Sequence, residues 1–312
     1  MSADKNLASE ITGSAGIESD MFKRKDIAHL LIHHDKVVGM HAVDGLEIET
    51  ESIKDGVKID LRLKEGTKVE HPVQMCFGMM PKSGVQRIVM NAVIEKDAHI
   101  DVLAHCTFPN AENVKHLMDA ELTLEENASY KYYERHIHSD KGGVEVVPKA
   151  KIHVGKHARY ITDFELLKGR VGLIDIDYET TCEEHSTLEM NARINATHDD
   201  VVKIREVGHL KGEYSRGVLL SRVAVRDHAE AKVYSELTAS APYARGHVDC
   251  KEIVQDDGIV SAVPIVKVNN PKAHITHEAS LGSVDSKQLQ TLMARGLSED
   301  EATDMIIQGL LQ

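Results

Sequence analysis

A short sequence motif recurs along the chain and limits the folds that the chain can adopt. Each copy reads as a strand, a short polar turn, an alanine and the start of another strand. Repeated units of this kind suit a parallel β-helix, in which every coil buries its inward side chains against the coils above and below. An antiparallel sandwich is the alternative, since its strands would also alternate. The copies are Ile94–Val102, Leu124–Tyr132, Ile152–Tyr160 and Val223–Ala231.

Alternation of apolar and polar residues extends this pattern from Gly45 to about Ser280. Such alternation predicts strands that are buried on one face, and no convincing helix interrupts it. The turns between the runs are not mainly the Asn-Gly or Asp-Gly pairs that hairpins favour. We therefore expect a mainly β protein with a β-helix core over residues 46–280, an N-terminal segment over 1–45 and a C-terminal helical segment over 281–312. The clearest runs are Leu46–Thr50, Val57–Leu63, Tyr130–His138 and Val171–Tyr178.

The N-terminal segment is expected to be partly helical. Residues 1–20 are polar with small residues and predict a weakly ordered lead-in, and the apolar residues of Met21–His34 fit helical spacing in part, which predicts a helix there. His29 and His33 would lie one turn apart on that helix. No acidic residue accompanies them at matching spacing, so surface histidines are favoured over a metal site.

The C-terminal segment predicts two short helices. Gly296 is placed to end the first helix in a left-handed conformation, and Ser298 with Glu301 predicts a capping box at the start of the second. Each helix has an apolar face, which needs a surface to pack on. That surface is either the end of the chain's own β-helix or a partner protein, and the sequence leaves both open. The apolar residues are Leu289, Leu292 and Met293 in the first helix and Ala302, Met305, Ile306 and Leu310 in the second.

The charge balance disfavours nucleic acid and anionic membranes as partners. The chain has 50 acidic and 37 basic residues, for a formal net charge of −13. No run approaches the roughly 18 apolar residues of a membrane span, and the first residues lack the apolar core of a signal peptide. We expect a cytoplasmic protein, in which the four cysteines are free thiols.

Several common catalytic and nucleotide-binding motifs are absent from the sequence. There is no GxxxxGK[ST] phosphate-binding loop, no GxSxG elbow and no HExxH pair. The chain is therefore not expected to bind a nucleotide through a P-loop. Cys182 and His185 form a C-x-x-H pair, for which a structural role is favoured over a metal site.

The stretch Gly246–Ser280 gathers the residues best suited to bind a metal. It contains a thiol, two imidazoles and a carboxylate at Cys250, His274, His277 and Glu278. Soft thiolate and imidazole ligands favour zinc or iron–sulfur chemistry over calcium or magnesium. A second thiol, Cys106, follows His105 at the end of an alternating run, but neighbouring residues on a strand point to opposite faces, so His105 does not activate it.

The same region resembles a known family. The segment Pro242–Val254, the following VPIVKVNNPKAHITHEAS and the final LQTLMARGLSEDEATDMIIQGLL are similar to SufB and SufD, the scaffold subunits of the SUF iron–sulfur cluster assembly machinery. The resemblance is strongest over residues 210–312 and extends more faintly back to about residue 70. It implies a right-handed parallel β-helix with flanking helices that dimerises through the β-helix.

The resemblance also implies roles for individual residues. Cys250 and Glu278 resemble a SufB cysteine and glutamate at the site of a transient iron–sulfur cluster, and His277 resembles a histidine that SufD contributes there. Cys106, in His-Cys-Thr-x-Pro, is faintly similar to family cysteines that accept sulfur from a donor protein. Thr276 stands where SufB tends to have a glutamate.

Partners follow from the same resemblance. The C-terminal helices would bind a SufC-type ATPase, so that this chain would be a scaffold without enzymatic activity of its own. The mixture of SufB-type and SufD-type residues suggests a homodimer in place of the usual SufB–SufD pair, with a heterodimer as the alternative. Two other functions stay open: a SufD-like accessory scaffold without its own cluster site, and a β-helix enzyme acting on carbohydrates.

Overall fold

The computed structural model describes residues 8–10, 12–14, 16–17 and 24–312. Its strands form two sheets, which we call the odd sheet and the even sheet after most of their members. The odd sheet has the order β19 (His274–Gly282), β17 (Arg245–Val254), β15 (Arg216–Val225), β13 (Thr187–Ala196), β11 (Arg159–Leu166), β9 (Ser129–His138), β7 (His99–Phe108), β5 (Val73–Gly78), β1 (His29–His33), β2 (Lys36–His41). The even sheet has the order β18 (Ile259–Val268), β16 (Glu230–Ala239), β14 (Val201–Leu210), β12 (Gly172–Cys182), β10 (Val144–Val154), β8 (Asn113–Leu124), β6 (Ser83–Ile94), β4 (Gly56–Leu63), β3 (Leu46–Ile53).

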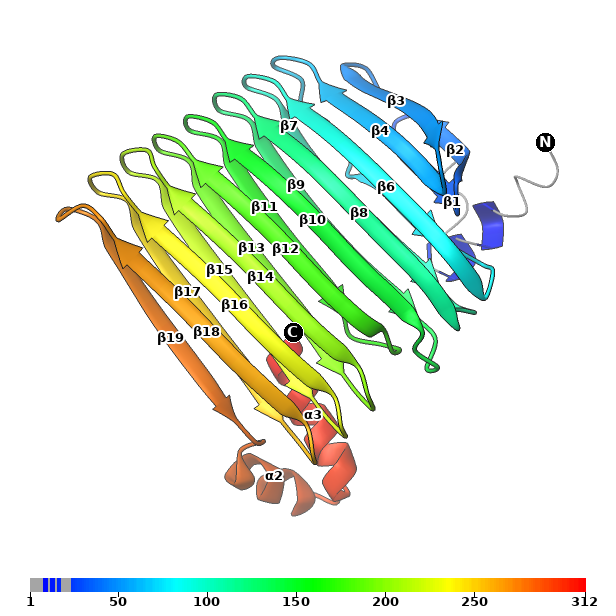
Figure 1. Cartoon of the computed structure of the whole chain (residues 1–312), viewed down its shortest axis with the longest axis vertical. Coiled ribbons are helices and arrows are strands. Elements are labelled where there is room, and N and C mark those ends of the chain that lie inside the picture. The colour runs from blue at the N-terminus through cyan, green and yellow to red at the C-terminus, as the bar shows by residue number, and fades with distance from the viewer. Residues whose placement is uncertain (1–7, 11, 15, 18–23) are drawn as a thin grey trace.

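Successive strands from β5 onward alternate between the two sheets, and their neighbours within each sheet are parallel (Figure 1). Within the part of the chain that the structure describes, only the pairs β1–β2 and β3–β4 at the N-terminal end are antiparallel. The chain therefore winds as a flattened parallel β-helix, which confirms the expected fold and excludes the sandwich. The inward side chains of both sheets form one continuous hydrophobic core.

The register of the later coils is regular. Thr187, Arg216, Arg245 and His274 pair in succession across β13, β15, β17 and β19, a period of 29 residues. Because side chains alternate along each strand, this register stacks every inward residue on the inward residue of the next coil. A polar side chain at an inward position is consequently held inside the β-helix.

The repeated alanine of the sequence is explained by a turn. At the turns that lead into β7, β9, β11, β13, β15 and β17, one residue adopts a left-handed conformation with φ between 57° and 61°, and the small residue after it is buried against the core. A larger side chain would not fit where the chain turns inward so sharply, so the small residue recurs. The left-handed residues are Asp97, Asn127, His157, His185, Tyr214 and Tyr243. The last four stack their rings in a ladder, with centroids 4.8, 4.9 and 4.8 Å apart.

The helix expected over Met21–His34 is wrong in its described part. Residues 29–33 form β1, which pairs in parallel with β5, so strand structure begins inside the segment expected to be partly helical. His29 is buried rather than on the surface. Four successive buried residues explain the error, because a strand covered on both faces shows no alternation to distinguish it from a helix. Residues 21–23, and most of the lead-in over 1–20, lie outside the described residues.

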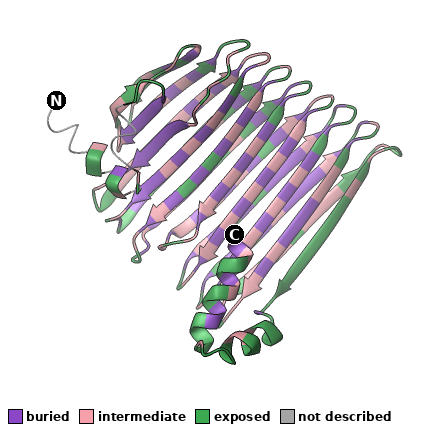
Figure 2. Cartoon of the chain, turned by 180° about the vertical axis from the view of Figure 1, so that it is seen from behind, coloured by how far each residue is buried: buried purple, intermediate pink, exposed green. Residues whose placement is uncertain are grey.

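The two expected C-terminal helices are present as α2 (Ser286–Met293) and α3 (Glu299–Leu311). The capping box of Ser298 and Glu301 is confirmed, and Gly296 has φ +99° just after α2. Helix α3 packs on the outer face of the odd sheet (Figure 2). Its residues Ile307 and Leu311 join Ala224 of β15 in a small apolar cluster. Among the described residues, no helix is both long and apolar enough to cross a membrane.

Candidate functional site

Cys250 lies on β17 with its side chain inside the β-helix. It pairs with Ser221 of β15 on one side and with Ala279 of β19 on the other, and its thiol is fully buried. Burial raises the pKa of the Cys250 thiol, while the hydroxyl groups of Ser221 and Ser235 act in the opposite direction. In this state the thiol is protonated at neutral pH, and binding a metal would require the loss of its proton.

His277 lies on the same face as Cys250, but Glu278 does not. In the register of β17 and β19, His277 pairs with Val248, which is two residues before Cys250 and therefore points the same way. Glu278 pairs with Asp249 and points outward. The structure thus brings two of the three expected cluster residues to one face at the end of the β-helix. His274 pairs with Arg245 at the start of β19, on the outward face with Glu278.

Glu278 has outward neighbours that the sequence analysis did not single out. The ligand atoms of His247, Asp249 and Glu278 all lie within 4.8 Å of one another. The Asp249 carboxylate is already bound by Arg222 at 2.5 Å and by Lys251 at 3.3 Å. Burial opposes ionisation of Asp249, but these two cations hold its pKa below the usual value. His247, Asp249 and Lys251 alternate along β17 and therefore share its outward face. This alternation is the signal that could have grouped His247 with Asp249 from the sequence.

Cys106 lies in a second interior site, far from Cys250 in the order of the coils. It is the inward residue near the end of β7 and has no exposed surface. Its Sγ lies 3.7 Å from Nε2 of His116 on β8 and 3.4 Å from Oε1 of Glu134 on β9. Burial raises the pKa of the Cys106 thiol well above its usual value, and the neighbouring Glu134 acts in the same direction. A protein that delivers sulfur could reach this thiol only if the coil opened.

Two further carboxyl groups are buried inside the later coils. Burial raises the pKa of Glu206 to about 8, and no hydrogen-bond partner lies near its Oε2 among the described residues. Burial also raises the pKa of Glu252 to about 7, and its Oε1 accepts a hydrogen bond of 2.8 Å from the Ser221 hydroxyl. Sequence reasoning missed both residues, although each occupies an inward position of an alternating strand.

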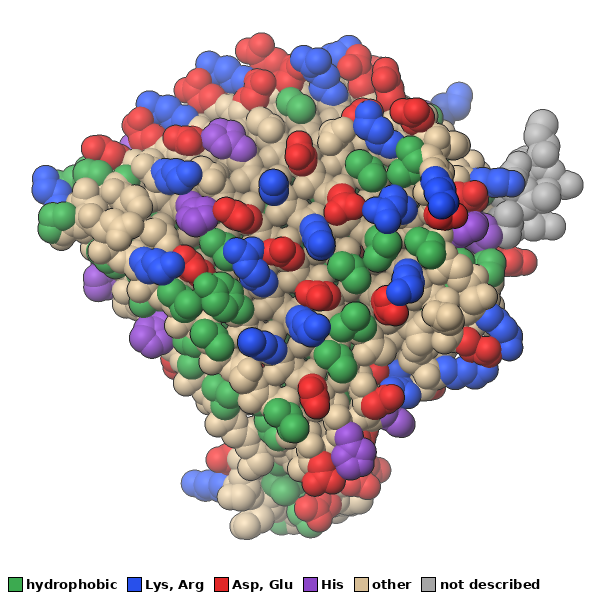
Figure 3. All heavy atoms as spheres, in the orientation of Figure 1, with side chains coloured by type: hydrophobic (Ala, Val, Ile, Leu, Met, Phe, Trp, Pro, Cys, Tyr) green, Lys and Arg blue, Asp and Glu red, His purple; other side chains and the backbone are tan. Residues whose placement is uncertain are grey.

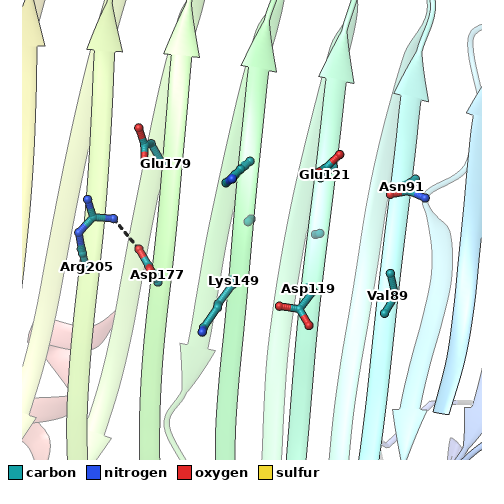
Figure 4. Close-up of a pocket in the computed structure, with 11 residues that line it drawn as sticks. Val89, Asn91, Asp119, Glu121, Lys149, Asp177, Glu179 and Arg205 are labelled. Atoms are coloured by element: carbon teal, nitrogen blue, oxygen red, sulfur yellow. Dashed lines mark hydrogen bonds and ion pairs between the residues drawn. The ribbon is translucent and has the colours of Figure 1, made fainter. Parts of the chain in front are cut away.

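A shallow groove on the outside of the even sheet collects acidic residues without pairing them for catalysis. Basic and acidic side chains are interspersed over this face (Figure 3), and the groove of about 360 Å³ is lined by Asp119, Glu121, Asp177 and Glu179 (Figure 4). Asp177 pairs with Arg205 at 2.5 Å, and Glu179 pairs with His209 at 3.1 Å. Asp177 and Glu179 are therefore each bound by a side chain of the neighbouring strand β14.

The apolar residues expected to bind an ATPase partner divide between buried and exposed positions. Ala302 is fully buried beneath α3, and Leu289 and Ile306 pack partly against the cluster on the odd sheet. Met293 and Met305 are exposed, and Leu292 and Leu310 are half-buried. The side of α3 that docks on the β-helix is centred on Ile307 and Leu311, one position along from the expected stripe.

Cys182 and His185 do not form a site together. The thiol is buried inside the β-helix, whereas the His185 ring lies in the ladder of stacked rings at the turns. This arrangement agrees with the structural role that the sequence favoured. Cys182 is consequently a suitable control for Cys106 and Cys250.

Fold and site together define a class of protein: a parallel β-helix with an interior thiol and an imidazole at its C-terminal end and two short helices beyond them. Residues 82–310 match the family described as "SUF system FeS cluster assembly, SufBD core domain". The chain belongs to this SufBD family of iron–sulfur cluster assembly proteins.

Individual relatives support the assignment. The chain is 37% identical to an iron–sulfur cluster assembly SufBD family protein of Pyrococcus horikoshii, over 97% of this chain and 92% of the relative. It is 35% identical to another of Methanocaldococcus jannaschii, over 93% of both chains. The iron–sulfur cluster assembly protein SufB of Bacillus subtilis is 24% identical over 80% of this chain and 54% of that protein.

Proposed function

We propose that this protein is a scaffold on which a transient iron–sulfur cluster is built, the cluster being cargo and not a resident cofactor. The observation that carries the proposal is the common inward face of Cys250 and His277 in the last two strands of the odd sheet. Thiolate and imidazole both serve as ligands of iron–sulfur clusters. Their place at the open end of the β-helix would let a cluster form without unwinding the core.

The scaffold would work as a homodimer joined through its last coil. Strands β18 and β19 are the edge strands of their sheets, and their exposed apolar residues include Ile259, Val263 and Leu281. An uncovered sheet edge with apolar side chains is suited to pairing with another chain. A second copy would supply the same edge and the same residues, so that Cys250 of one subunit would face His277 of the other.

The C-terminal helices would bind a SufC-type ATPase, which would supply the nucleotide hydrolysis for which this sequence has no P-loop motif. The exposed Met293 and Met305 support this proposal, because flexible methionines on a surface adapt readily to a partner. Cys106 would accept sulfur from a donor protein only through an opened coil, since its thiol is buried.

Anaerobic reconstitution with iron and sulfide tests the scaffold proposal. Visible absorption of the wild type is compared with that of Cys250→Ala, His277→Ala and Cys182→Ala, each checked for wild-type circular dichroism. We expect the cluster absorption to be lost in Cys250→Ala, strongly reduced in His277→Ala and unchanged in Cys182→Ala. Accumulation of cluster at the wild-type rate in Cys250→Ala would contradict the proposal.

A further inference from the structure

The interior of the early coils holds a group of side chains that the proposed function uses only in part, because it assigns a role to Cys106 and none to the two residues beside it. Cys106, His116 and Glu134 come from β7, β8 and β9, so they join both sheets across the inside of the β-helix. All three are buried. Their ligand atoms lie within 4.8 Å of one another.

The distances between these atoms agree with the geometry of a bound metal ion. Zinc binds thiolate sulfur at about 2.3 Å and imidazole nitrogen at about 2.0–2.1 Å, so two such ligands of a tetrahedral ion are about 3.5 Å apart. The Sγ of Cys106 lies 3.7 Å from Nε2 of His116 and 3.4 Å from Oε1 of Glu134. Little movement would be needed to place one ion between them.

The hydrogen bonds around His116 leave the correct nitrogen free to bind a metal. The amide nitrogen of Gln86 donates to the carbonyl oxygens of His34 and Gly78. The Oε1 of Gln86 must therefore accept from Nδ1 of His116, which lies 3.0 Å away. With its proton on Nδ1, His116 presents the lone pair of Nε2 to Cys106. A partner that fixes the tautomer in this way is a regular feature of metal-binding histidines.

Glu134 is oriented by a similar chain. Its Oε1 lies 2.9 Å from Nε2 of His136, whose Nδ1 is 3.1 Å from Nε2 of His138. Nδ1 of His138 donates to the carbonyl oxygen of Arg170 at 3.1 Å, which holds this row of rings in place. The carboxylate thus keeps a fixed position beside the thiol.

Charge is compatible with an ion at this position. A carboxylate in the interior of a protein is costly unless it is paired, and Glu134 is paired with His136. A divalent cation bound by one thiolate, one carboxylate and one neutral imidazole forms a group with no net charge. Mixed sulfur, nitrogen and oxygen ligands suit zinc or ferrous iron better than calcium or magnesium.

We propose that Cys106, His116 and Glu134 form a buried binding site for one divalent transition-metal ion of the Zn²⁺ and Fe²⁺ class. Binding releases the Cys106 proton to solvent and leaves the fourth coordination position for a ligand from outside these three residues. The site is separate from the proposed cluster residues, which lie on β17 and β19, and it does not depend on the proposed function.

Metal content and a spectroscopic probe test the site. The full chain is unfolded, stripped with a chelator, refolded anaerobically with Zn²⁺, Fe²⁺ or Co²⁺, and washed with chelator to remove ions from surface histidines. We expect about one ion per chain to be retained with Zn²⁺ or Fe²⁺. The Co²⁺ form should show a thiolate-to-metal charge-transfer band in the near-ultraviolet. The variants are Cys106→Ala, His116→Gln and Glu134→Gln, with Cys182→Ala and Cys250→Ala as controls.

The site is supported if both controls keep the ion and the charge-transfer band while Cys106→Ala loses both. His116→Gln keeps the thiol and should bind at least tenfold more weakly, so it reports on the site even if Cys106→Ala does not fold. The proposal is overturned if the refolded wild type retains none of the three ions, or if a folded Cys106→Ala or His116→Gln retains as much as the wild type. If Cys250→Ala retained the metal ion but no longer assembled the cluster, the metal site would be shown to be independent of the proposed cluster site.

Discussion

Cys250 and Glu278 lie on opposite faces of one sheet, although they belong to its last two strands. Cys250 pairs with Ala279, whereas Glu278 pairs with Asp249 in the same register. The thiol consequently points into the β-helix and the carboxylate points out of it. One subunit in this conformation cannot place both on a single cluster, so a site that uses both would need a second subunit or a change in the last coil.

Mixed dimers should reveal whether two subunits build the proposed cluster site. If Cys250 of one subunit faces His277 of the other, a dimer of one Cys250→Ala chain and one His277→Ala chain keeps one intact site out of two. We expect such dimers, isolated with two different affinity tags, to hold about half of the wild-type cluster per dimer. Each variant alone should hold almost none. If the mixed dimer held as little cluster as either variant alone, the ligands would instead come from the same chain.

The titration of Glu206 should make the free energy of unfolding decrease as the pH rises. Its pKa in the folded protein is raised to about 8 by burial, whereas an unfolded glutamate titrates near pH 4.3. Between these values the folded state holds a proton that the unfolded state has lost, so the free energy of unfolding falls as pH rises, by a few kcal/mol in total.

Urea unfolding at pH 5, 7 and 9 checks this effect. Glu206→Gln should flatten the decrease, because the neutral amide does not ionise, and it should be more stable than the wild type at pH 9. The exposed Glu121→Gln serves as the control and should follow the wild type at every pH. An equally steep decrease in Glu206→Gln would assign the pH dependence to other groups, among them Glu252.

The β-helix could be predicted from the sequence because its repeated unit is local. The left-handed turn residue and the small residue after it, as at Asn127 and Ala128, recur where the chain enters the odd-sheet strands from β7 to β17. Cys250 and His277 were singled out by their ligand chemistry and then by the family resemblance, but their common face follows only from the register of two strands. That register is a property of the coil length, which a single strand does not reveal.

The interior polar residues were missed for a different reason. Glu134 follows Tyr130 and Tyr132 at alternate positions of one strand, so the pattern already placed its side chain inward. His116 comes from the other sheet, however, and nothing in the sequence relates its position to that of Cys106. Which inward residues meet across the β-helix depends on how the two sheets are offset, and that offset is set by packing along the whole chain.

Helix α3 should respond differently to changes on its two sides. Ile307 is 2% exposed and packs on the odd sheet, and the end of the helix is held by a hydrogen bond of 3.1 Å from Arg193 to the carbonyl oxygen of Leu311. Ile307→Ala should weaken this docking by about 2–4 kcal/mol and speed amide hydrogen exchange in α3.

Met305, on the same helix, is 51% exposed. Met305→Ala should leave hydrogen exchange in α3 unchanged but weaken binding to the SufC-type ATPase, measured by calorimetry. Wild-type affinity in both Met305→Ala and Met293→Ala would argue against the exposed methionines as the partner surface. Faster exchange in Met305→Ala would show that this residue also holds the helix in place.

The left-handed turns should discriminate sharply between side chains. Tyr214 has φ 58° and stacks between His185 and Tyr243. Tyr214→Asn and Tyr214→Val both lose the stacking, but asparagine tolerates this conformation and a β-branched residue does not. We expect Tyr214→Val to be less stable than Tyr214→Asn by about 1–2 kcal/mol in urea unfolding.

The same two substitutions at the exposed strand residue Lys203, which has no left-handed backbone, should rank in the opposite order, because valine favours strands. Equal stability of the two Tyr214 variants would mean that the turn relaxes out of the left-handed region when its ring is removed.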